Sequence, residues 1–223
     1  MYYVLIGDIK RSKTINNRIQ FQKNLKLMFE SINQKYEKDI VKNLTITLGD
    51  EFQGVFNRFD NILEIIEKIS FFVWPVSIRF GIGYGDLLFD NSLSKSDPFN
   101  SDGEAFWFAR EAIDEIKANE NVNKIDIKSN VLIKGNNNLN DMVTNEMLNL
   151  IEVIKVNWSK VQSETILFII ENYGLTNDFV QSEVSKELDI MPNTLNARLK
   201  RSYFNNYVNG VVIINEIMRK MKK

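Results

Sequence analysis

The chain has 223 residues, with 28 basic and 29 acidic side chains and neither cysteine nor histidine. Missing both residue types excludes disulfide frameworks, thiolate or imidazole zinc sites, cysteine nucleophiles and Ser-His-Asp triads. The balanced charge argues against a protein that coats nucleic acid by charge alone. Any catalysis therefore uses carboxylates, lysine, arginine, hydroxyls, backbone amides and hard metal ions.

The hydropathy pattern is that of an ordinary globular protein, long enough for one large or two small domains. No run approaches the roughly 18 apolar residues of a membrane span, and the N-terminus does not have the pattern of a secretion signal. We therefore expect a cytoplasmic protein without a membrane span.

The first predicted strand, residues 2–7, is followed by an acid and a basic loop. The residues of this segment are Asp8, Ile9, Lys10, Arg11 and Ser12. Backbone amides and cations in such a turn, ahead of a helix predicted over residues 16–37, suit phosphate oxygens. A solvated loop that caps the helix explains the same residues, so both interpretations stay open.

A β-hairpin with two acids at its tip is predicted over residues 44–56. Alternating apolar residues form its strands, and Gly49 and Asp50 form its turn. Asp50 and Glu51 are neighbouring like charges, which favours a positive partner opposite them. If the first strand lies beside this hairpin, Asp8 joins them in a site suited to Mg²⁺ or Mn²⁺. The alternative is an ordinary Gly-Asp turn.

A glycine-rich strand over residues 76–85 follows a second predicted helix. One face carries apolar residues, and the other carries Arg79, Gly81 and Gly83. Glycine weakens a strand, so a glycine-bearing face indicates that something approaches the backbone closely, and Arg79 is a candidate anion contact. A twisted or bulged strand with a surface arginine is the alternative.

The order of predicted elements gives an α+β domain and then an all-helical one. A polar loop spans 90–103, a helix 102–118, and further strands 122–128 and 131–133. This order predicts a mixed sheet with helices on one face, close to a ferredoxin-like arrangement. We place the first domain at residues 1–137, a helical linker at 138–157 and the second domain at 158–223.

The second domain has a helix-turn-helix pattern between residues 178 and 203. A turn at 189–191 separates two apolar-periodic segments, and Pro192 begins the second helix. The outward residues of that helix are Asn193, Thr194, Asn196, Arg198 and Lys200. The basic excess after residue 157 is small, so DNA contact and protein docking stay open as alternatives.

These motifs, in this order, resemble the bacterial SatD family. The segments that carry the resemblance are 6–12, 45–54, 78–85 and 102–112, followed by Trp158 and Gln162 ahead of the helix-turn-helix. The first domain is more distantly similar to class III nucleotidyl cyclases and GGDEF diguanylate cyclases. The resemblance implies a palm-type domain and then a winged-helix-like domain. In such enzymes metal ions polarise the α-phosphate and lower the pKa of an attacking 3′-hydroxyl.

The resemblance also implies roles for individual residues. Metal would be held by Asp8, the Ile9 carbonyl, Asp50 and Glu51. Together with the basic loop and the glycine-rich strand, this gives candidate phosphate contacts at Ile9, Lys10, Arg11, Ser12, Arg79, Gly81 and Gly83. The candidate catalytic residues are Asp8, Asp50, Glu51 and Arg110. Three positions depart from the pattern. Leu48 replaces the first GGDEF glycine, and Trp107 replaces the transition-state asparagine of cyclases. Arg110 lies one residue, about 100° of helix rotation, before the expected arginine.

Two functional hypotheses follow from these observations. The first is a Mg²⁺- or Mn²⁺-dependent domain that binds a nucleoside triphosphate, as a nucleotidyl cyclase or nucleotidyltransferase, joined to a helix-turn-helix module. The second is a non-enzymatic regulator that senses a triphosphate or cyclic nucleotide and binds DNA or a protein partner. The cyclase resemblance also implies a homodimer. A structural domain whose acids are only turn residues is a third alternative.

Overall fold

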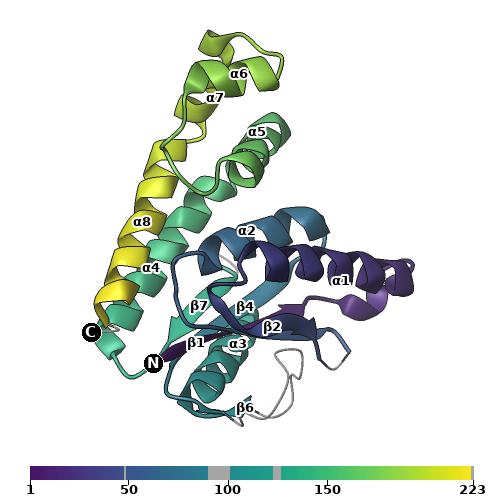
Figure 1. The fold of residues 1–223 in the computed structure, drawn as a ribbon, viewed down its shortest axis with the longest axis vertical. Helices are drawn as coiled ribbons and strands as arrows, with labels where there is room; N and C mark the ends of the chain where they lie inside the picture. The colour runs from purple at the N-terminus through teal and green to yellow at the C-terminus, as the bar shows by residue number, and fades with distance from the viewer. Residues whose placement is uncertain (48, 90–100, 123–126, 222–223) are drawn as a thin grey trace.

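The computed structural model describes residues 1–47, 49–89, 101–122 and 127–221. Within these ranges the fold is mixed α/β, with a five-stranded sheet, a small two-stranded sheet and eight α-helices. Figure 1 shows the sheet with helices above and below it, and a helical extension that ends in α5, α6 and α7. None of the helices in these ranges combines the length and apolar character needed to cross a membrane.

The main sheet is built around β1. Its strands are β1 (Tyr2–Ile9), β2 (Ile40–Ile46), β3 (Glu51–Phe56), β4 (Ile78–Gly85) and β7 (Val131–Lys134). They lie in the order β2-β3-β1-β4-β7, antiparallel except for the parallel pair β4–β7. The predicted hairpin is confirmed. Its first strand begins earlier than predicted because register shifts around Lys42 interrupt the alternation.

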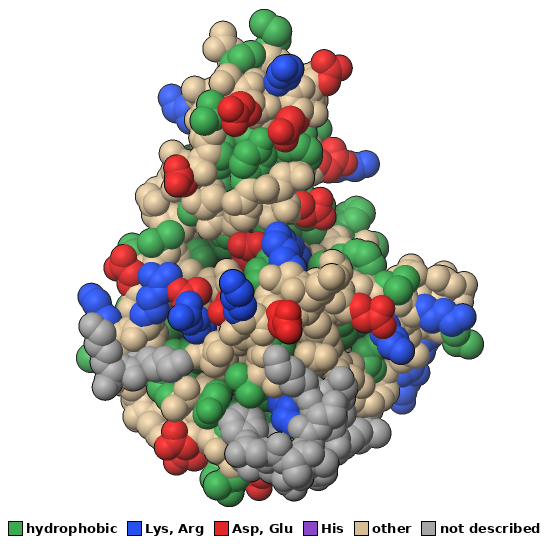
Figure 2. Space-filling view, viewed as in Figure 1, with side chains coloured by type: hydrophobic (Ala, Val, Ile, Leu, Met, Phe, Trp, Pro, Cys, Tyr) green, Lys and Arg blue, Asp and Glu red, His purple; other side chains and the backbone are tan. Residues whose placement is uncertain are grey.

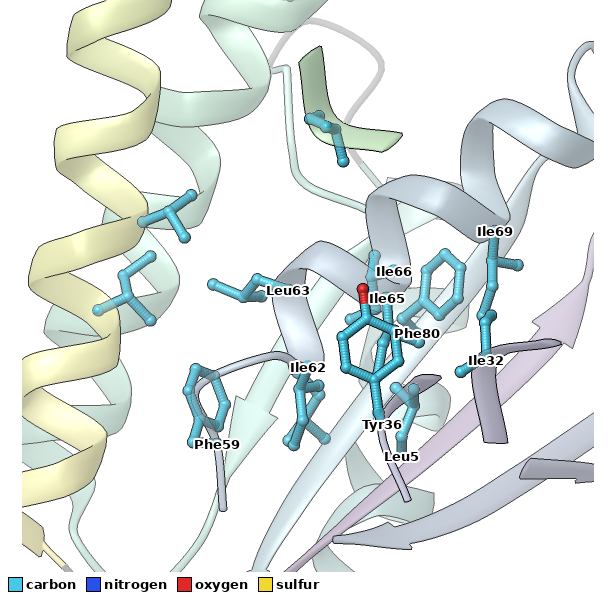
Figure 3. Packing of buried hydrophobic residues seen from close by; sticks show 14 of the residues in the cluster. Leu5, Ile32, Tyr36, Phe59, Ile62, Leu63, Ile65, Ile66, Ile69 and Phe80 are labelled. Atoms are coloured by element: carbon cyan, nitrogen blue, oxygen red, sulfur yellow. The ribbon is translucent and has the colours of Figure 1, made fainter. Parts of the chain in front are cut away.

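Helices α1 (Arg18–Lys35) and α2 (Ile62–Val73) cover one face of the sheet. Alternating residues of each strand supply the apolar floor, as the pattern of the β4 sequence predicted. Figure 3 shows Ile62, Ile65 and Ile69 of α2 pointing toward the sheet side chains Leu5 and Phe80. Isoleucine three to four residues apart gives α2 the apolar stripe that this packing requires.

Helix α3 (Glu104–Val122) covers the opposite face, so the prediction of helices on one face was wrong. The reason lies in small residues on both partners. A Cβ at Gly81 would stand 2.3 Å from the carbonyl oxygen of Ala109, and one at Gly83 would stand 2.0 Å from that of Ala105. The glycine face therefore admits the backbone of a helix, which is the close approach that glycine allows.

The outer edge of β7 is covered by side chains of α4 (Asn138–Lys155). Asn145 both accepts from Ile133 N and donates to Ile133 O, each at 2.8 Å. Asn149 accepts from the backbone N–H of Ser129 at 3.0 Å, and Asp141 accepts from that of Gly135 at 2.8 Å. These side chains, spaced four residues apart along α4, satisfy an edge that would otherwise pair with another strand.

Two predicted segments fall partly outside the described residues. The strand predicted over 122–128 begins at Val122, which is the last residue of α3, and residues 123–126 are outside the described ranges. Most of the polar loop predicted over 90–103 is also outside them. Its flanks pair as the short strands β5 (Leu88–Phe89) and β6 (Ser101–Asp102).

The remaining helices continue the same apolar core. They are α5 (Lys160–Asn172), α6 (Gln181–Glu187), α7 (Pro192–Arg201) and α8 (Phe204–Met221). Helix α8 returns beside α4 to the sheet, where Tyr3 Oη donates to the carbonyl of Met218 at 3.1 Å. The segment predicted as a helical linker is α4, which contacts both β7 and α8. The domain boundaries themselves stay predictions.

Candidate functional site

Three charged side chains form a row across neighbouring strands at one end of the sheet. Asp8 of β1 lies opposite Glu51 of β3 on one side and Arg79 of β4 on the other. Residues that face each other across antiparallel strands project from the same side of a sheet. That side carries α3, since Ile6 of β1 belongs to the same packed cluster as Ala109. We call Glu51, Asp8 and Arg79 the charged row.

Cations hold both carboxylates of the charged row. Arg79 donates from Nη1 to Asp8 Oδ2 at 2.6 Å, and Lys117 Nζ of α3 lies 3.3 Å from the same oxygen. Arg110 of α3 donates from Nη1 to both oxygens of Glu51, at 2.8 and 2.7 Å. Asp8 is buried, whereas the side chains of Arg110 and Lys117 are 47% and 41% exposed. The row is therefore closed on the sheet side and open on the side of these two cations.

Glu120 of α3 joins the charged row to the loop after β1. It accepts from Arg79 Nη2 at 2.6 Å and lies 2.6 Å from Lys10 Nζ. Burial alone would raise the pKa of Glu120, but hydrogen bonds from Arg79 and Lys10 outweigh burial and lower that pKa. Burial likewise opposes the charge of Arg79, yet its bonds to Glu120 and Asp8 raise its pKa. Both groups are charged at neutral pH.

The loop after β1 is tied to the hairpin tip. Ser12 is buried, and its hydroxyl donates to Asp50 Oδ2 at 2.5 Å. The backbone N–H of Ile9 donates to the carbonyl of Asp50 at 3.1 Å. Arg11 is exposed and has a left-handed backbone with φ of 51°, just before the short 3₁₀ turn Ser12–Thr14. Asp50 is thus fixed beside the charged row by both its side chain and its backbone.

Comparison with known families identifies the chain. A model of the SatD family matches residues 2–217, which is nearly the whole sequence. The chain belongs to the SatD family. A search of curated proteins gave no match. The SatD match spans both the sheet and the C-terminal helices, so the charged row and helices α6 and α7 are parts of one family architecture.

Most of the site residues predicted for this SatD family member meet at the charged row and the adjoining loop. They are Asp8, Ile9, Lys10, Arg11, Ser12, Asp50, Glu51, Arg79 and Arg110. Gly81 and Gly83 lie beneath α3, whose backbone fills the space in front of them. Leu48 lies outside the described residues. The convergence of the first strand and the hairpin is what the sequence predicted.

Two residues of the site were missed from the sequence. Lys117 and Glu120 follow Arg110 along α3 by seven and ten residues, and the strand ends lie against this part of the helix. Residues three, four and seven apart share one side of a helix. Continuing the helical spacing from Arg110 would have found Lys117 and indicated Glu120.

The predicted outward residues of α7 are only partly outward. Asn193, Thr194, Asn196 and Lys200 are exposed. Arg198 is half-buried and donates from Nη1 to Thr165 Oγ1 of α5 at 3.1 Å. On the face that Figure 2 shows, acidic and basic side chains are interspersed over the C-terminal helices.

Asp8 and Glu51 are the residues of the charged row that could hold a divalent cation. In the described part of the chain, no three acidic side chains stand together as a ready-made metal site. Mg²⁺, however, commonly takes only one or two protein carboxylates, with phosphate and water oxygens completing the shell. Asp8 and Glu51 are two such carboxylates on one face of the sheet. Asp50 precedes Glu51 and accepts a hydrogen bond from Ser12 in the loop after β1. The donor set therefore fits a metal that arrives with a phosphate ligand.

A hollow of about 360 Å³ lies beside the charged row, against α3. Its lining residues are Ile6, Phe106, Trp107, Arg110, Glu111 and Asp114. Arg110 belongs to both features, since its guanidinium binds Glu51. A larger hollow of about 730 Å³ lies between α3, β7 and α4. Lys10 of the loop after β1 and Glu120 of α3 are among its lining residues.

Proposed function

We propose that this SatD family member binds a nucleoside triphosphate together with Mg²⁺ or Mn²⁺ at the charged row. The observation that carries the proposal is the register that sets Asp8 beside Glu51, with Arg79 on the next strand. Adjacent carboxylates can take a cation, and arginine and lysine can take the phosphate oxygens. In this proposal the β1–β4 unit is a ferredoxin-like palm of the cyclase or GGDEF type, supported by the strand order β2-β3-β1-β4.

The contacts of the charged row indicate how a ligand would enter it. Glu51 and Arg110 neutralise each other in the structure, and Arg110 is half-exposed. Asp8 and Glu51 would hold the metal, and Arg110 and Lys117, which pair with these acids here, would then be available to the phosphate oxygens. Asp50 and the Ile9 carbonyl would support the metal, and Lys10, Arg11 and Ser12 would lie beside the phosphates. When bound, the metal would neutralise phosphate charge and acidify a bound hydroxyl.

The first candidate activity is that of a nucleotidyl cyclase or nucleotidyltransferase. The acids Asp8, Asp50 and Glu51 and the cation Arg110 are the residues proposed to act on the triphosphate. Their supports are the shared face of Asp8 and Glu51 and the bond of Arg110 to Glu51. Preorganised charge of this kind is the main contribution that a protein makes to phosphoryl chemistry.

The second candidate is a nucleotide sensor without catalytic activity. Trp107 stands where cyclases place a transition-state donor, and its single N–H already donates to Asp102 Oδ1 at 3.0 Å. A tryptophan has no second donor to offer a phosphate. The sensor would act on DNA or a protein through α6 and α7 as a helix-turn-helix. That role is supported by the exposed polar residues of α7 and by the tight turn at Asp189, whose φ is 52°.

The proposal is tested by calorimetric titration of the protein with ATP and with GTP, each with and without Mn²⁺. Chromatography of the same mixtures after incubation then detects any new nucleotide. We expect metal-dependent binding in the wild type and its loss in Asp8→Asn and in Glu51→Gln. Glu171 is an exposed residue of α5, so Glu171→Gln is the matched control and should bind as the wild type does.

The outcomes separate the candidates. Binding with a new nucleotide product identifies the enzyme and its substrate, whereas binding without turnover identifies the sensor. Equal affinity in the wild type, Asp8→Asn and Glu51→Gln, with all three folded by circular dichroism, would contradict the proposed site.

A further inference from the structure

Trp107 is exposed yet held in one orientation. Its side chain lies in the first turns of α3, and the residue is 58% exposed. Its Nε1 donates to Asp102 Oδ1, and the same oxygen accepts from the backbone N–H of Gly103 at 2.8 Å. A hydrogen bond at the ring edge leaves the face of the indole ring available for stacking, and the anchored Asp102 restricts its rotation. Trp107 therefore offers an aromatic surface at the edge of the hollow on which a planar ligand can stack.

The hollow in front of Trp107 is linked to the charged row through Ile6 and Arg110. Ile6 of β1 forms its floor, and Asp8 follows two residues later on the same face of the strand, about 7 Å away. Arg110, one turn after Trp107 on α3, lines the hollow and reaches Glu51. A ligand with one end in the hollow can therefore reach Arg110 and the charged row with its other end.

We propose that this hollow holds the base of the nucleotide, stacked on Trp107, while the phosphates lie at the charged row. The inference rests on the proposed nucleotide binding and assigns the base to a specific surface. Trp107, which lacks the donor needed for transition-state chemistry, then has a role in binding.

A planar heterocyclic base fits the chemistry of the hollow better than another phosphate or an aliphatic group. Its walls carry the aromatic rings of Phe106 and Trp107, which favour a flat π-surface. The carboxylates Glu111 and Asp114 also line it and would repel a second anion, whereas they can accept hydrogen bonds from amino groups of a base.

The test compares nucleotides with inorganic tripolyphosphate, which carries the phosphates without a base. Affinities of ATP, GTP and tripolyphosphate are measured with Mn²⁺ in wild type, Trp107→Ala and Trp107→Phe. Stacking on one aromatic side chain corresponds to about tenfold in affinity. We expect the wild type to bind at least one of the nucleotides about tenfold more tightly than tripolyphosphate. Trp107→Ala should lose this preference and keep its tripolyphosphate affinity, and Trp107→Phe should keep most of the preference.

Trp74→Ala is the matched control, because Trp74 is an exposed tryptophan at the end of α2. It should leave all affinities unchanged. A preference for nucleotides that survives in Trp107→Ala would overturn this inference and leave the proposed function standing. Wild-type protein that binds neither nucleotides nor tripolyphosphate would overturn both.

Discussion

Two groups of paired charges in this protein have the same chemistry and different surroundings. The first is the charged row. The second, which we call the α2 cluster, consists of Tyr36, Glu64, Lys68, Glu67 and Lys155. In the α2 cluster Lys68 Nζ donates to Glu64 at 2.7 Å and to Tyr36 Oη at 2.8 Å, and Lys155 Nζ donates to Glu67 at 2.6 Å. Both groups set carboxylates against cations next to the core of the sheet domain.

The difference lies in what surrounds the cations. The partners in the α2 cluster are enclosed: the side chains of Glu67 and Lys155 are 10% and 19% exposed, and Glu64 also accepts from the backbone N–H of Leu175. Of the cations that contact the charged row, Arg79 is 17% exposed and thus as enclosed as Lys155, whereas Arg110 and Lys117 reach solvent. Enclosed pairs join α2 to α4 and to the segment after α5, whereas pairs with an exposed partner can exchange that partner for a ligand. Exposure therefore separates a structural from a functional interpretation of similar ion pairs.

The largest effect on stability is expected from Lys155→Met. This change leaves the Glu67 carboxylate enclosed without its cation, and removing one partner of a buried pair costs about 3 kcal/mol. Urea unfolding measures the loss, and nucleotide affinity should not change. The double variant Glu67→Gln/Lys155→Met should recover much of the stability, because Glu67, the more enclosed of the two carboxylates paired with Lys155, then carries no charge. A single variant as stable as the wild type would contradict the structural role of the Glu67–Lys155 pair.

Asp8→Asn should have an intermediate effect on stability and abolish nucleotide binding. Arg79 keeps its bonds to Glu120 in this variant, so only part of its pairing is lost. We expect a loss of about 1–2 kcal/mol in the free energy of unfolding. Urea unfolding and calorimetric titration of the same preparation check the two effects. If Asp8→Asn is destabilised to this degree but binds the nucleotide as tightly as the wild type does, the charged row has a structural role like that of the α2 cluster.

The pH dependence of stability should involve both groups. Burial alone would raise the pKa of Glu64, but hydrogen bonds from Lys68, Tyr36 and Leu175 outweigh burial and lower that pKa. Hydrogen bonds from Arg79 and Lys10 lower the pKa of Glu120 in the same way. A carboxylate with a lowered pKa in the folded state stabilises the protein above its ordinary pKa of 4.5, and this stabilisation is lost as the pH falls further.

The urea concentration at the unfolding midpoint should therefore decrease as the pH is lowered below about 4.5. Glu64→Gln should be less stable than the wild type at neutral pH, and its midpoint should vary less with pH between 3 and 6. Glu120→Gln should show the same flattening to a smaller degree, because its side chain is one-third exposed. Parallel pH curves for wild type and Glu64→Gln would contradict the pKa assignment.

Arg110→Gln should have the smallest effect on stability and a large effect on binding. Its ion pair with Glu51 is half-exposed, and such pairs contribute about 0.5 kcal/mol. Loss of a phosphate contact should weaken nucleotide affinity by about tenfold or more. Thermal unfolding and titration measure the two changes. If Arg110→Gln lost more stability than Asp8→Asn, the half-exposed ion pair would stabilise the fold more than the enclosed one, which contradicts the comparison between exposed and enclosed partners.

The sequence predicted those parts of the fold that depend on local pattern. The alternation of β4 identified its core face, and the Gly49-Asp50 turn identified the hairpin. The side of the sheet taken by α3 was not predictable from periodicity, because Gly81 and Gly83 indicate close approach without indicating what approaches. The covering of the β7 edge by Asn145 was also missed, since an asparagine on a helix has no periodic signal that distinguishes a strand partner from solvent.

The candidate site was predicted as a set of residues and not as a set of pairs. Asp8, Asp50 and Glu51 converge because strand ends and turns place them at the same end of the sheet. That Arg79 binds Asp8, and that Arg110 binds Glu51, depends on the register of β1 against β4 and on the position of α3. Those are long-range features, and local sequence does not encode them.

Mn²⁺ electron paramagnetic resonance tests most directly whether the charged row binds a metal together with a nucleotide. The signal of free Mn²⁺ is recorded with GTP or ATP and then with wild-type protein or Asp8→Asn. We expect the wild type, and equally Lys155→Met under conditions where it stays folded, to reduce the free signal beyond the nucleotide alone. Asp8→Asn should not reduce it. The same reduction by Asp8→Asn and the wild type would contradict the assignment of this row as the site.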